Sequence, residues 1–250
     1  MHVRAIAIIP ARFASTRLPG KALASLDGRP MIRHVAERTC QARSVTRVIV
    51  ATDDERIAGA VAGSGADVVM TRADHPSGTD RLAEVAAHLD ADVLVNVQGD
   101  LPLLDPAMVD RLVERMAGDP TLPMATLASP IHDEDEWQSP HVVKVVADAH
   151  GRALYFSRSP IPHHRDGVRP GAPFGWRHIG MYAYRRDALL RFAALAPTPL
   201  ETSERLEQLR ALEHGIAIGV EPWTGAEPVI EVDVVEDLER ARAALSGRTT

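Results

Sequence analysis

The chain is poor in cysteine, and this scarcity excludes several classes of protein. Cys40 is the only cysteine among 250 residues, so no disulfide framework can form within the chain. No group of cysteines and histidines has the spacing of a zinc site. No apolar run approaches the roughly 18 residues that a membrane helix needs, and no signal-peptide pattern is present. We therefore expect a soluble, cytoplasmic protein with no membrane partner.

Excess positive charge is absent as well. The formal net charge is −6, which argues against a protein that coats nucleic acid. With 45% hydrophobic residues, a chain of this length can bury a core as one large or two small domains. Because its cations gather in one short loop, a small anionic ligand is a better expectation than a polymer.

That loop follows the first strand-like segment. An apolar run stops at Pro10, and the next residues read ARFASTRLPGK, with Arg12, Arg17 and Lys21 around Ser15 and a glycine. A strand that ends in a glycine-containing loop with three cations is suited to binding a polyanion such as a triphosphate. The spacing matches neither the Walker pattern nor the dinucleotide fingerprint. The alternative interpretation is a solvated turn with scattered cations.

Apolar runs alternate with helix signals along the first half of the chain. Strand-like runs occupy residues 4–9, 46–51, 67–70 and 92–97. Helices are predicted over residues 30–42, 55–62, 79–89 (with Thr79 as the cap) and 105–116. This order predicts a three-layer α/β fold with a mostly parallel, Rossmann-like sheet. Ligands bind such sheets beyond the carboxyl ends of the strands, where the cationic loop, ATDD and QGD all fall.

The pattern changes after about residue 120. MATLASP, VVKVVAD, ALYFS and HIGMYAY predict short strands of a mixed or antiparallel insertion, and residues 160–176 predict an exposed, mobile loop. A helix over 199–213, a strand over 228–233 and a helix over 236–245 are predicted to follow. We interpret residues 1–250 as one domain. Its core spans 1–120 and 216–250, and a smaller β-rich substrate lobe spans 121–215.

AxxxSTRLPGK directly after the first strand resembles the nucleotide-binding signature of sugar-nucleotide cytidylyltransferases, above all the CMP-Kdo synthetase (3-deoxy-manno-octulosonate cytidylyltransferase) family. The likeness recurs at ATDD, SGTDR, NVQGD, ALYFSR, RHIGMYAYR, LEQLRALEHG and VEDLERAR, and so covers nearly the whole chain. It implies a nucleotidyltransferase that needs Mg²⁺ and transfers CMP from CTP to a 3-deoxy sugar acid, with Kdo as the expected acceptor. The product would serve lipopolysaccharide or capsule synthesis. The resemblance also implies that residues 1–120 and 216–250 form the nucleotide-binding core, and that the lobe of residues 121–215 binds the acceptor and forms a homodimer.

Two aspartates are candidates for the metal. Asp100 ends the run VLVNVQG, and Asp233 ends another apolar run before a helix. Mg²⁺ takes one or two protein carboxylates, with phosphates and water completing its shell, although either aspartate could instead cap a loop or helix. The resemblance implies that both hold the metal. Where the family usually reads QGDEP this chain reads QGDLP, so Leu101 removes a carboxylate beside that position.

The resemblance also implies a nucleotide site and an acceptor site. The nucleotide contacts are Pro10, Ala11, Arg12, Ser15, Arg17, Lys21, Thr52, Asp53, Ser77, Gly78, Thr79 and Gln98. Arg12, Lys21 and Asp100 are the expected catalytic residues. From composition alone, SGTDR is more typical of a helix start than of a base pocket.

For the acceptor, the implied contacts are Arg158, His178, Tyr182, Glu207 and Gln208. An arginine fork can bind a sugar carboxylate through two N–H groups. His178, Tyr182 and Tyr184 lie at even spacing on one strand, so they share a face, and Tyr184 is predicted to pack in the core.

Two alternatives remain open at this stage. The acceptor could be another small acid, such as an 8-amino-Kdo analogue or a phosphonate, and Leu101 motivates that reading. The chain could also be a non-catalytic nucleotide-binding protein, but two metal carboxylates and the cations Arg12 and Lys21 argue against it. No Ser-His-Asp or Cys-His arrangement is evident in the sequence, so direct displacement without a covalent enzyme intermediate is expected.

Overall fold

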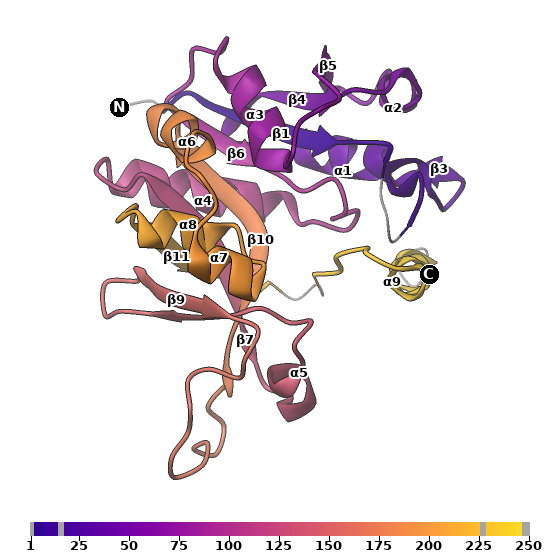
Figure 1. Ribbon diagram of the computed structural model, residues 1–250. Helices are drawn as coiled ribbons and strands as arrows, with labels where there is room; N and C mark the ends of the chain where they lie inside the picture. The colour runs from indigo at the N-terminus through magenta and orange to yellow at the C-terminus, as the bar shows by residue number, and fades with distance from the viewer. Residues whose placement is uncertain (1–2, 15–17, 226–228, 247–250) are drawn as a thin grey trace. The chain divides into compact units, whose positions relative to one another are not determined.

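The computed structural model describes residues 3–14, 18–225 and 229–246. The chain divides into two compact units, residues 1–114 with 225–250 and residues 115–224 (Figure 1). The strand Ile218–Pro222 (β11) falls in the second unit, although the sequence assigned it to the nucleotide-binding core. Among the described residues, no helix combines the length and the apolar character that crossing a membrane requires.

The first unit carries four parallel strands and the helices that connect them. Its elements are β1 (Ala5–Ala11), the 3₁₀ helix η1 (Lys21–Leu23), β2 (Ser25–Leu26), β3 (Arg29–Pro30), α1 (Met31–Thr39), β4 (Val45–Thr52), α2 (Glu55–Ala60), β5 (Asp67–Met70), α3 (Gly78–Ala86), β6 (Val93–Asn96), α4 (Pro106–Gly118, which runs into the second unit) and α9 (Val235–Ser246).

The parallel strands of this unit lie in the order β6-β1-β4-β5. The chain moves outward from β1 through α1 to β4 and through α2 to β5, then returns through α3 to β6 on the other side of β1. Because such crossovers are right-handed, α1 and α2 cover one face and α3 the other (Figure 1). The predicted α/β sheet is therefore confirmed, with β1 as a fully buried central strand over Ala5 and Ala7–Ile9.

Capping side chains begin two of these helices. The Asp54 carboxylate accepts a hydrogen bond from Arg56 N at 2.9 Å and begins α2, and Ser77 Oγ accepts one from Asp80 N at 3.2 Å and begins α3. The prediction that Thr79 is the cap is therefore wrong. Thr79 instead lies inside the first turn of α3 and is 4% exposed. The cap is Ser77, two residues earlier, which accepts from the free N–H group of Asp80.

The strand predicted over residues 228–233 does not form across the described residues 229–233. Val232 N instead donates to Asp100 O at 2.9 Å, which ties this segment to the loop after β6. Val232 is buried in a cluster with Leu26, Met31 and Leu238 of α9. Burial of Val232 explains the apolar run that suggested a strand.

The second unit is β-rich, as predicted. Its elements are β7 (Met124–Ile131), α5 (Glu134–Gln138), β8 (Lys144–Ala147), β9 (Ala153–Ser157), β10 (Gly175–Arg185), α6 (Arg186–Ala193), α7 (Pro199–Glu204), α8 (Gln208–Glu213) and β11. Strand β7 lies between antiparallel β10 and parallel β11, and antiparallel β8 pairs with both β10 and β9.

The helix predicted over residues 199–213 is divided into α7 and α8. Arg205 has φ 53° and ψ 48°, a left-handed conformation that ends α7. At its start, Glu201 Oε2 accepts a hydrogen bond from Thr198 N at 3.1 Å. The break places Glu207 at the N-cap position of α8 and Gln208 at its first residue.

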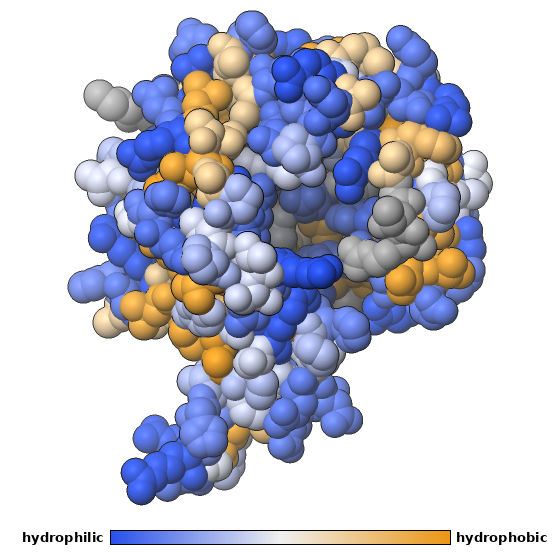
Figure 2. All heavy atoms as spheres, in the orientation of Figure 1, coloured by the Kyte–Doolittle hydropathy of each residue, from blue (hydrophilic) through white to orange (hydrophobic). Residues whose placement is uncertain are grey.

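Residues 158–174 join β9 to β10 and extend from the body of their unit as an arm (Figure 1). Most of residues 162–172 are exposed, as predicted, and hydrophilic side chains cover the tip (Figure 2). The base of the arm is anchored. Trp137 Nε1 donates to Ile161 O at 3.2 Å, and its ring contacts those of His164 and Phe174.

Candidate active site

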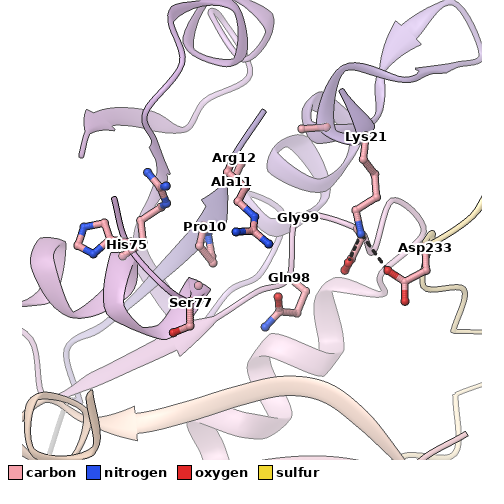
Figure 3. A pocket seen from close by; sticks show the side chains of 13 residues that line it. Pro10, Ala11, Arg12, Lys21, His75, Ser77, Gln98, Gly99 and Asp233 are labelled. Atoms are coloured by element: carbon pink, nitrogen blue, oxygen red, sulfur yellow. Dashed lines mark hydrogen bonds and ion pairs between the residues drawn. The ribbon is translucent and has the colours of Figure 1, made fainter. Parts of the chain in front are cut away.

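A cavity of about 250 Å³ lies in the first unit, beyond the carboxyl ends of β1 and β6. This is where ligands bind in open parallel sheets. The lining residues come from the end of β1 and the loop after it, η1, the turn before α3 and the first turn of α3, the loop after β6 and the segment before α9. They are Pro10, Ala11, Arg12, Lys21, Ala22, His75, Ser77, Gly78, Arg81, Gln98, Gly99, Asp100 and Asp233 (Figure 3).

Gly99 allows two of these loops to approach each other closely. A Cβ atom at this position would lie 3.2 Å from Pro10 O and 3.4 Å from Ile32 Cδ1. Both separations are tighter than ordinary van der Waals contact, and one of the atoms belongs to the backbone. A side chain at position 99 would therefore push the loop that carries Asp100 away from the end of β1.

Lys21 lies between two carboxylates. Its Nζ atom is 2.7 Å from Asp100 Oδ2 and 3.1 Å from Asp233 Oδ1 (Figure 3). Burial alone would lower the pKa of Lys21, but the two carboxylates outweigh burial and raise it. Lys21 is therefore a cation at neutral pH, and three side chains far apart in the sequence meet here as a charged triad.

Backbone contacts hold the two aspartates independently of Lys21. Val232 N donates to Asp100 O at 2.9 Å, and Asp237 Oδ2 accepts from Asp233 N at 2.9 Å. Burial would raise the pKa of Asp237, but hydrogen bonds from Asp233 N, Arg240 and Val234 N lower it, so Asp237 remains an ionised acceptor.

The carboxylate pair fits a hard divalent cation such as Mg²⁺. Two aspartate oxygens converge on one cationic atom, and Mg²⁺ commonly takes one or two protein carboxylates, with phosphates and water as the remaining ligands. Among the described residues, no group of three or more His, Cys, Asp or Glu side chains could hold a metal. A metal at this site would therefore complete its shell with oxygen ligands from water or from its substrate.

Four lining residues, Ala22, His75, Arg81 and Gly99, are absent from the sequence prediction, and two of them, His75 and Arg81, carry polar side chains. The His75 side chain is 5% exposed and contacts Glu84 through Nε2. The Arg81 side chain is 3% exposed, donates to Thr71 Oγ1 and pairs with Asp53 Oδ2 at 3.5 Å. Arg81 stands in the quoted motif SGTDR, so its position was available in the sequence. The partner of His75 lies nine residues away, and no motif marks it.

Most of the predicted nucleotide contacts in the described residues line the cavity. Pro10, Ala11, Arg12, Lys21, Ser77, Gly78 and Gln98 do so. Thr52 and Thr79 are buried and do not, and neither does Asp53, although it pairs with the lining residue Arg81. Ser15 and Arg17 lie outside the described residues, so their predicted roles stay predictions.

Leu101 is 1% exposed and does not line the cavity. The departure from QGDEP therefore places an apolar side chain in the core beside Asp100 instead of a carboxylate in the site.

The predicted acceptor residues lie in the second unit. Arg158 follows β9, where its Nε donates to Glu204 O at 2.9 Å and its Nη1 to Pro140 O at 3.0 Å. Two carbonyls thus fix the guanidinium. The same segment is supported by Lys144, a fully buried lysine whose Nζ donates to the carbonyls of Ser139, Val142 and Arg158 at 2.9, 2.7 and 2.5 Å.

His178 and Tyr182 lie together in β10, with ring centroids 5.3 Å apart. Thr126 Oγ1 donates to Met181 O at 2.8 Å and lies 3.1 Å from His178 Nε2, so Nε2 is the protonated donor. Burial, with a smaller effect from Arg177, lowers the pKa of His178 to about 3, which keeps the ring neutral at neutral pH. Tyr184 is 2% exposed and stacks on Phe192, so its predicted packing role is confirmed.

Gln208 is 7% exposed, and its Nε2 atom is buried without a hydrogen-bond partner among the described residues. A buried amide donor without a partner is costly in a folded protein, and a ligand oxygen would satisfy it. Helix α8, which begins at Gln208, packs against β9, the strand that leads to Arg158.

Comparison with known proteins identifies the family. The cytidylyltransferase family model matches residues 6–218. The chain belongs to the 3-deoxy-manno-octulosonate cytidylyltransferases. It is 56% identical over 244 residues to the protein of that name from Pelobacter propionicus, covering 94% of this chain and 95% of the relative. It is 53% identical over 247 residues to the one from Syntrophotalea carbinolica, covering 96% and 98%.

The fold agrees with this membership. A solved structure of CMP:2-keto-3-deoxy-manno-octonic acid synthetase complexed with CTP superimposes with a TM-score of 0.91 at 44% identity, over 98% of this chain and 99% of that one. The resemblance seen in the sequence motifs is confirmed, and the chain is a nucleotidyltransferase.

Proposed function

We propose that the protein transfers CMP from CTP to 3-deoxy-manno-octulosonate (Kdo), giving CMP-Kdo and pyrophosphate in a reaction that needs Mg²⁺. The observation that carries the proposal is the charged triad of Lys21, Asp100 and Asp233 at one side of the cavity. A cation and a carboxylate pair at the end of a parallel sheet suit a metal–triphosphate. Membership of the family and the CTP-bound structural relative support the same choice of nucleotide.

In this reaction the anomeric hydroxyl of Kdo attacks the α-phosphorus of CTP. A new oxygen–phosphorus bond forms, the bond to the β-phosphate oxygen breaks, pyrophosphate leaves and the hydroxyl proton passes to solvent. Arg12 and Lys21 bind the phosphates and stabilise the leaving group. Bound Mg²⁺, held by Asp100 and Asp233, would supply further charge neutralisation and lower the pKa of the attacking hydroxyl.

Recognition of Kdo falls to the second unit in this proposal. Arg158 offers its remaining guanidinium N–H groups to the sugar carboxylate. His178, neutral because burial depresses its pKa, and Gln208, with a buried amide donor, suit hydroxyl groups. Tyr182 beside His178 and Glu207 beside Gln208 complete the proposed contacts.

The setting of the reaction follows from its substrates. CTP is a cytoplasmic nucleotide, so we place the reaction in the cytoplasm, with CMP-Kdo supplied to lipopolysaccharide or capsule synthesis. A homodimer is part of the proposal as well. Leu154 on β9, 63% exposed, is a large apolar side chain that an interface through the second unit could cover. Light scattering would measure the mass in solution.

A substrate panel tests the proposal. Pyrophosphate release is measured with CTP, ATP, GTP or UTP against Kdo, 8-amino-Kdo, a small phosphonate and no acceptor, each with and without Mg²⁺. We expect release only with CTP, Kdo and Mg²⁺ together. Faster release with the analogue or the phosphonate would overturn the choice of acceptor. CTP binding without release for any acceptor would favour a non-catalytic binder.

A further inference from the structure

The turn between β5 and α3, residues 71–77, is fastened to helix α3 at three points. Ser77 Oγ donates to Asp80 Oδ2 at 2.6 Å, Arg81 donates to Thr71 Oγ1, and Glu84 contacts His75. The contact furthest along the helix involves Glu84. Its Oε2 atom also accepts a hydrogen bond from Arg72 N at 3.2 Å, so one carboxylate holds the turn at two places.

Glu84 is an ionised acceptor in this position. Burial would raise its pKa, but the hydrogen bonds from His75 and from Arg72 N lower it. Because a carboxylate can only accept, the His75 Nε2 atom carries the proton and donates. The orientation of the imidazole is thereby fixed, and Nδ1 is the ring nitrogen left to face other groups.

His75 is buried within the wall of the cavity, with 5% of its side chain exposed. Figure 3 shows His75 and Ser77 on one side of the pocket, and Lys21 and Asp233 on the other. If the triphosphate lies at the Lys21 side, the nucleoside extends toward His75. A polar ring that is already held rigidly at that side favours binding, because its side chain loses little conformational entropy when the ligand binds.

We propose that Glu84 is a positioning residue for the nucleotide: it fixes the His75 ring as a wall of the nucleoside side of the cavity and so sets the affinity for CTP. This rests on the proposed function, which names CTP as the ligand. Glu84 itself does not line the cavity, so its effect on the nucleotide passes through His75.

The test is a double-mutant cycle on Glu84→Ala and His75→Phe. The dissociation constant for CTP is measured by calorimetry without acceptor, and KM is measured for both substrates. Each single change should weaken CTP about tenfold and leave the KM for Kdo within about twofold. Because Glu84 acts through His75, the double variant should bind CTP no more weakly than His75→Phe alone. Glu84→Gln, which keeps an acceptor for the ring, should lose less.

Matched controls separate this role from a general loss of charge or of an imidazole. Glu55→Ala removes an exposed acidic residue from α2, and His88→Phe removes an exposed histidine just after α3. Neither residue lines the cavity, and both variants should bind CTP as the wild type does.

Three results would overturn the inference. The first is unchanged CTP affinity in folded Glu84→Ala. The second is a double variant whose loss of CTP affinity equals the product of the two single losses. The third is an equal rise in KM for CTP and Kdo, which indicates a merely structural role. Should Glu84→Ala unfold, His75→Phe decides: CTP affinity equal to that of the wild type in this variant would sink the idea, because Glu84 is proposed to act through the His75 ring. Wild-type protein that neither binds CTP nor releases pyrophosphate would instead refute the proposed function, which is a separate outcome.

Discussion

The ammonium group of Lys21 lies 2.7 Å from Asp100 Oδ2, so an internal cation occupies the mouth of the carboxylate pair that we assign to Mg²⁺. The aspartate segments are tied by the bond from Val232 N to Asp100 O, so the pair does not depend on Lys21 to hold it together. Lys21 and a metal ion therefore compete for the same oxygens. Nucleotide phosphates offer Lys21 another anionic partner, which would couple metal binding to CTP binding.

Replacing Lys21 by methionine should have opposite effects on the two ligands. Without the ammonium group, Mn²⁺ used in place of Mg²⁺ should bind the free protein about tenfold more tightly, whereas CTP should bind about tenfold more weakly. Each factor corresponds to about 1.4 kcal/mol, close to the lower end of the range of about 1.5–3 kcal/mol for one hydrogen bond to a charged group. Calorimetry with each ligand alone and with both together measures the affinities and their coupling.

Arg47→Met is the control for that experiment, since it removes an exposed cation of β4 that pairs with Asp67 outside the cavity. Metal affinity that stays equal or falls in Lys21→Met would show that Lys21 and the metal do not compete. Coupling between metal and CTP should shrink in the variant, because one of its sources is the transfer of Lys21 from carboxylates to phosphates.

Asp100→Ala should abolish turnover and leave the fold intact, because Asp100 is assigned to the metal and, across the part of the chain that the structure describes, its carboxylate contacts only Lys21. Pyrophosphate release and a thermal unfolding curve measure the two effects. A variant with more than roughly a tenth of the wild-type kcat, a loss below about 1.4 kcal/mol, would remove Asp100 from the metal site. EDTA should stop the wild-type reaction, and added Mg²⁺ should restore it.

The sequence predicted the elements whose signals are local. The apolar runs that became β1, β4, β5 and β6 end in polar loops, and Asp105 before Pro106 marks the start of α4, where its carboxylate accepts from Ala107 N. Parallel order then requires these loops to meet at one edge of the sheet. This explains why Lys21 and Asp100, 79 residues apart, could be assigned to one site from the sequence.

Features that depend on distant partners were not predictable in this way. The left-handed turn at Arg205 divides a sequence that otherwise reads as one helix. Val232 is apolar because it is buried against α1 and α9, not because it belongs to a strand. His75 has no signature of its own, since its role follows from the Glu84 carboxylate that the first turns of α3 bring beside it.

Burial of His178 predicts a dependence of stability on pH. Its pKa is depressed to about 3 in the folded protein, against about 6.5 in the unfolded chain. Between these values the unfolded state binds the additional proton, so the free energy of unfolding falls as the pH is lowered from about 6.5 toward 3. The contribution is at most about 1.4 kcal/mol per pH unit for one proton.

Denaturant unfolding of the wild type and of His178→Gln at several pH values between 4 and 8 measures this contribution. The wild type should lose more stability than the variant below pH 6, and the two profiles should run parallel above pH 7. The comparison uses the slopes of the free energy of unfolding against pH in the two proteins. It removes the effects of other titrating groups and of any pH-independent change in stability caused by the substitution. Parallel profiles throughout would mean that His178 is accessible enough to ionise in the folded protein.

Gln208→Leu should separate binding from stability. The Gln208 amide is buried with no hydrogen-bond partner for Nε2 among the described residues, so a leucine there removes an unsatisfied donor. The variant should unfold at the same or a higher temperature, by an amount corresponding to about 1 kcal/mol. If a hydroxyl or carboxylate of the sugar acid accepts from this amide, the KM for Kdo should rise about tenfold while that for CTP stays constant. Higher stability together with an unchanged KM for Kdo would take Gln208 out of the acceptor site, whereas lower stability would mean that the amide has a partner in the folded protein.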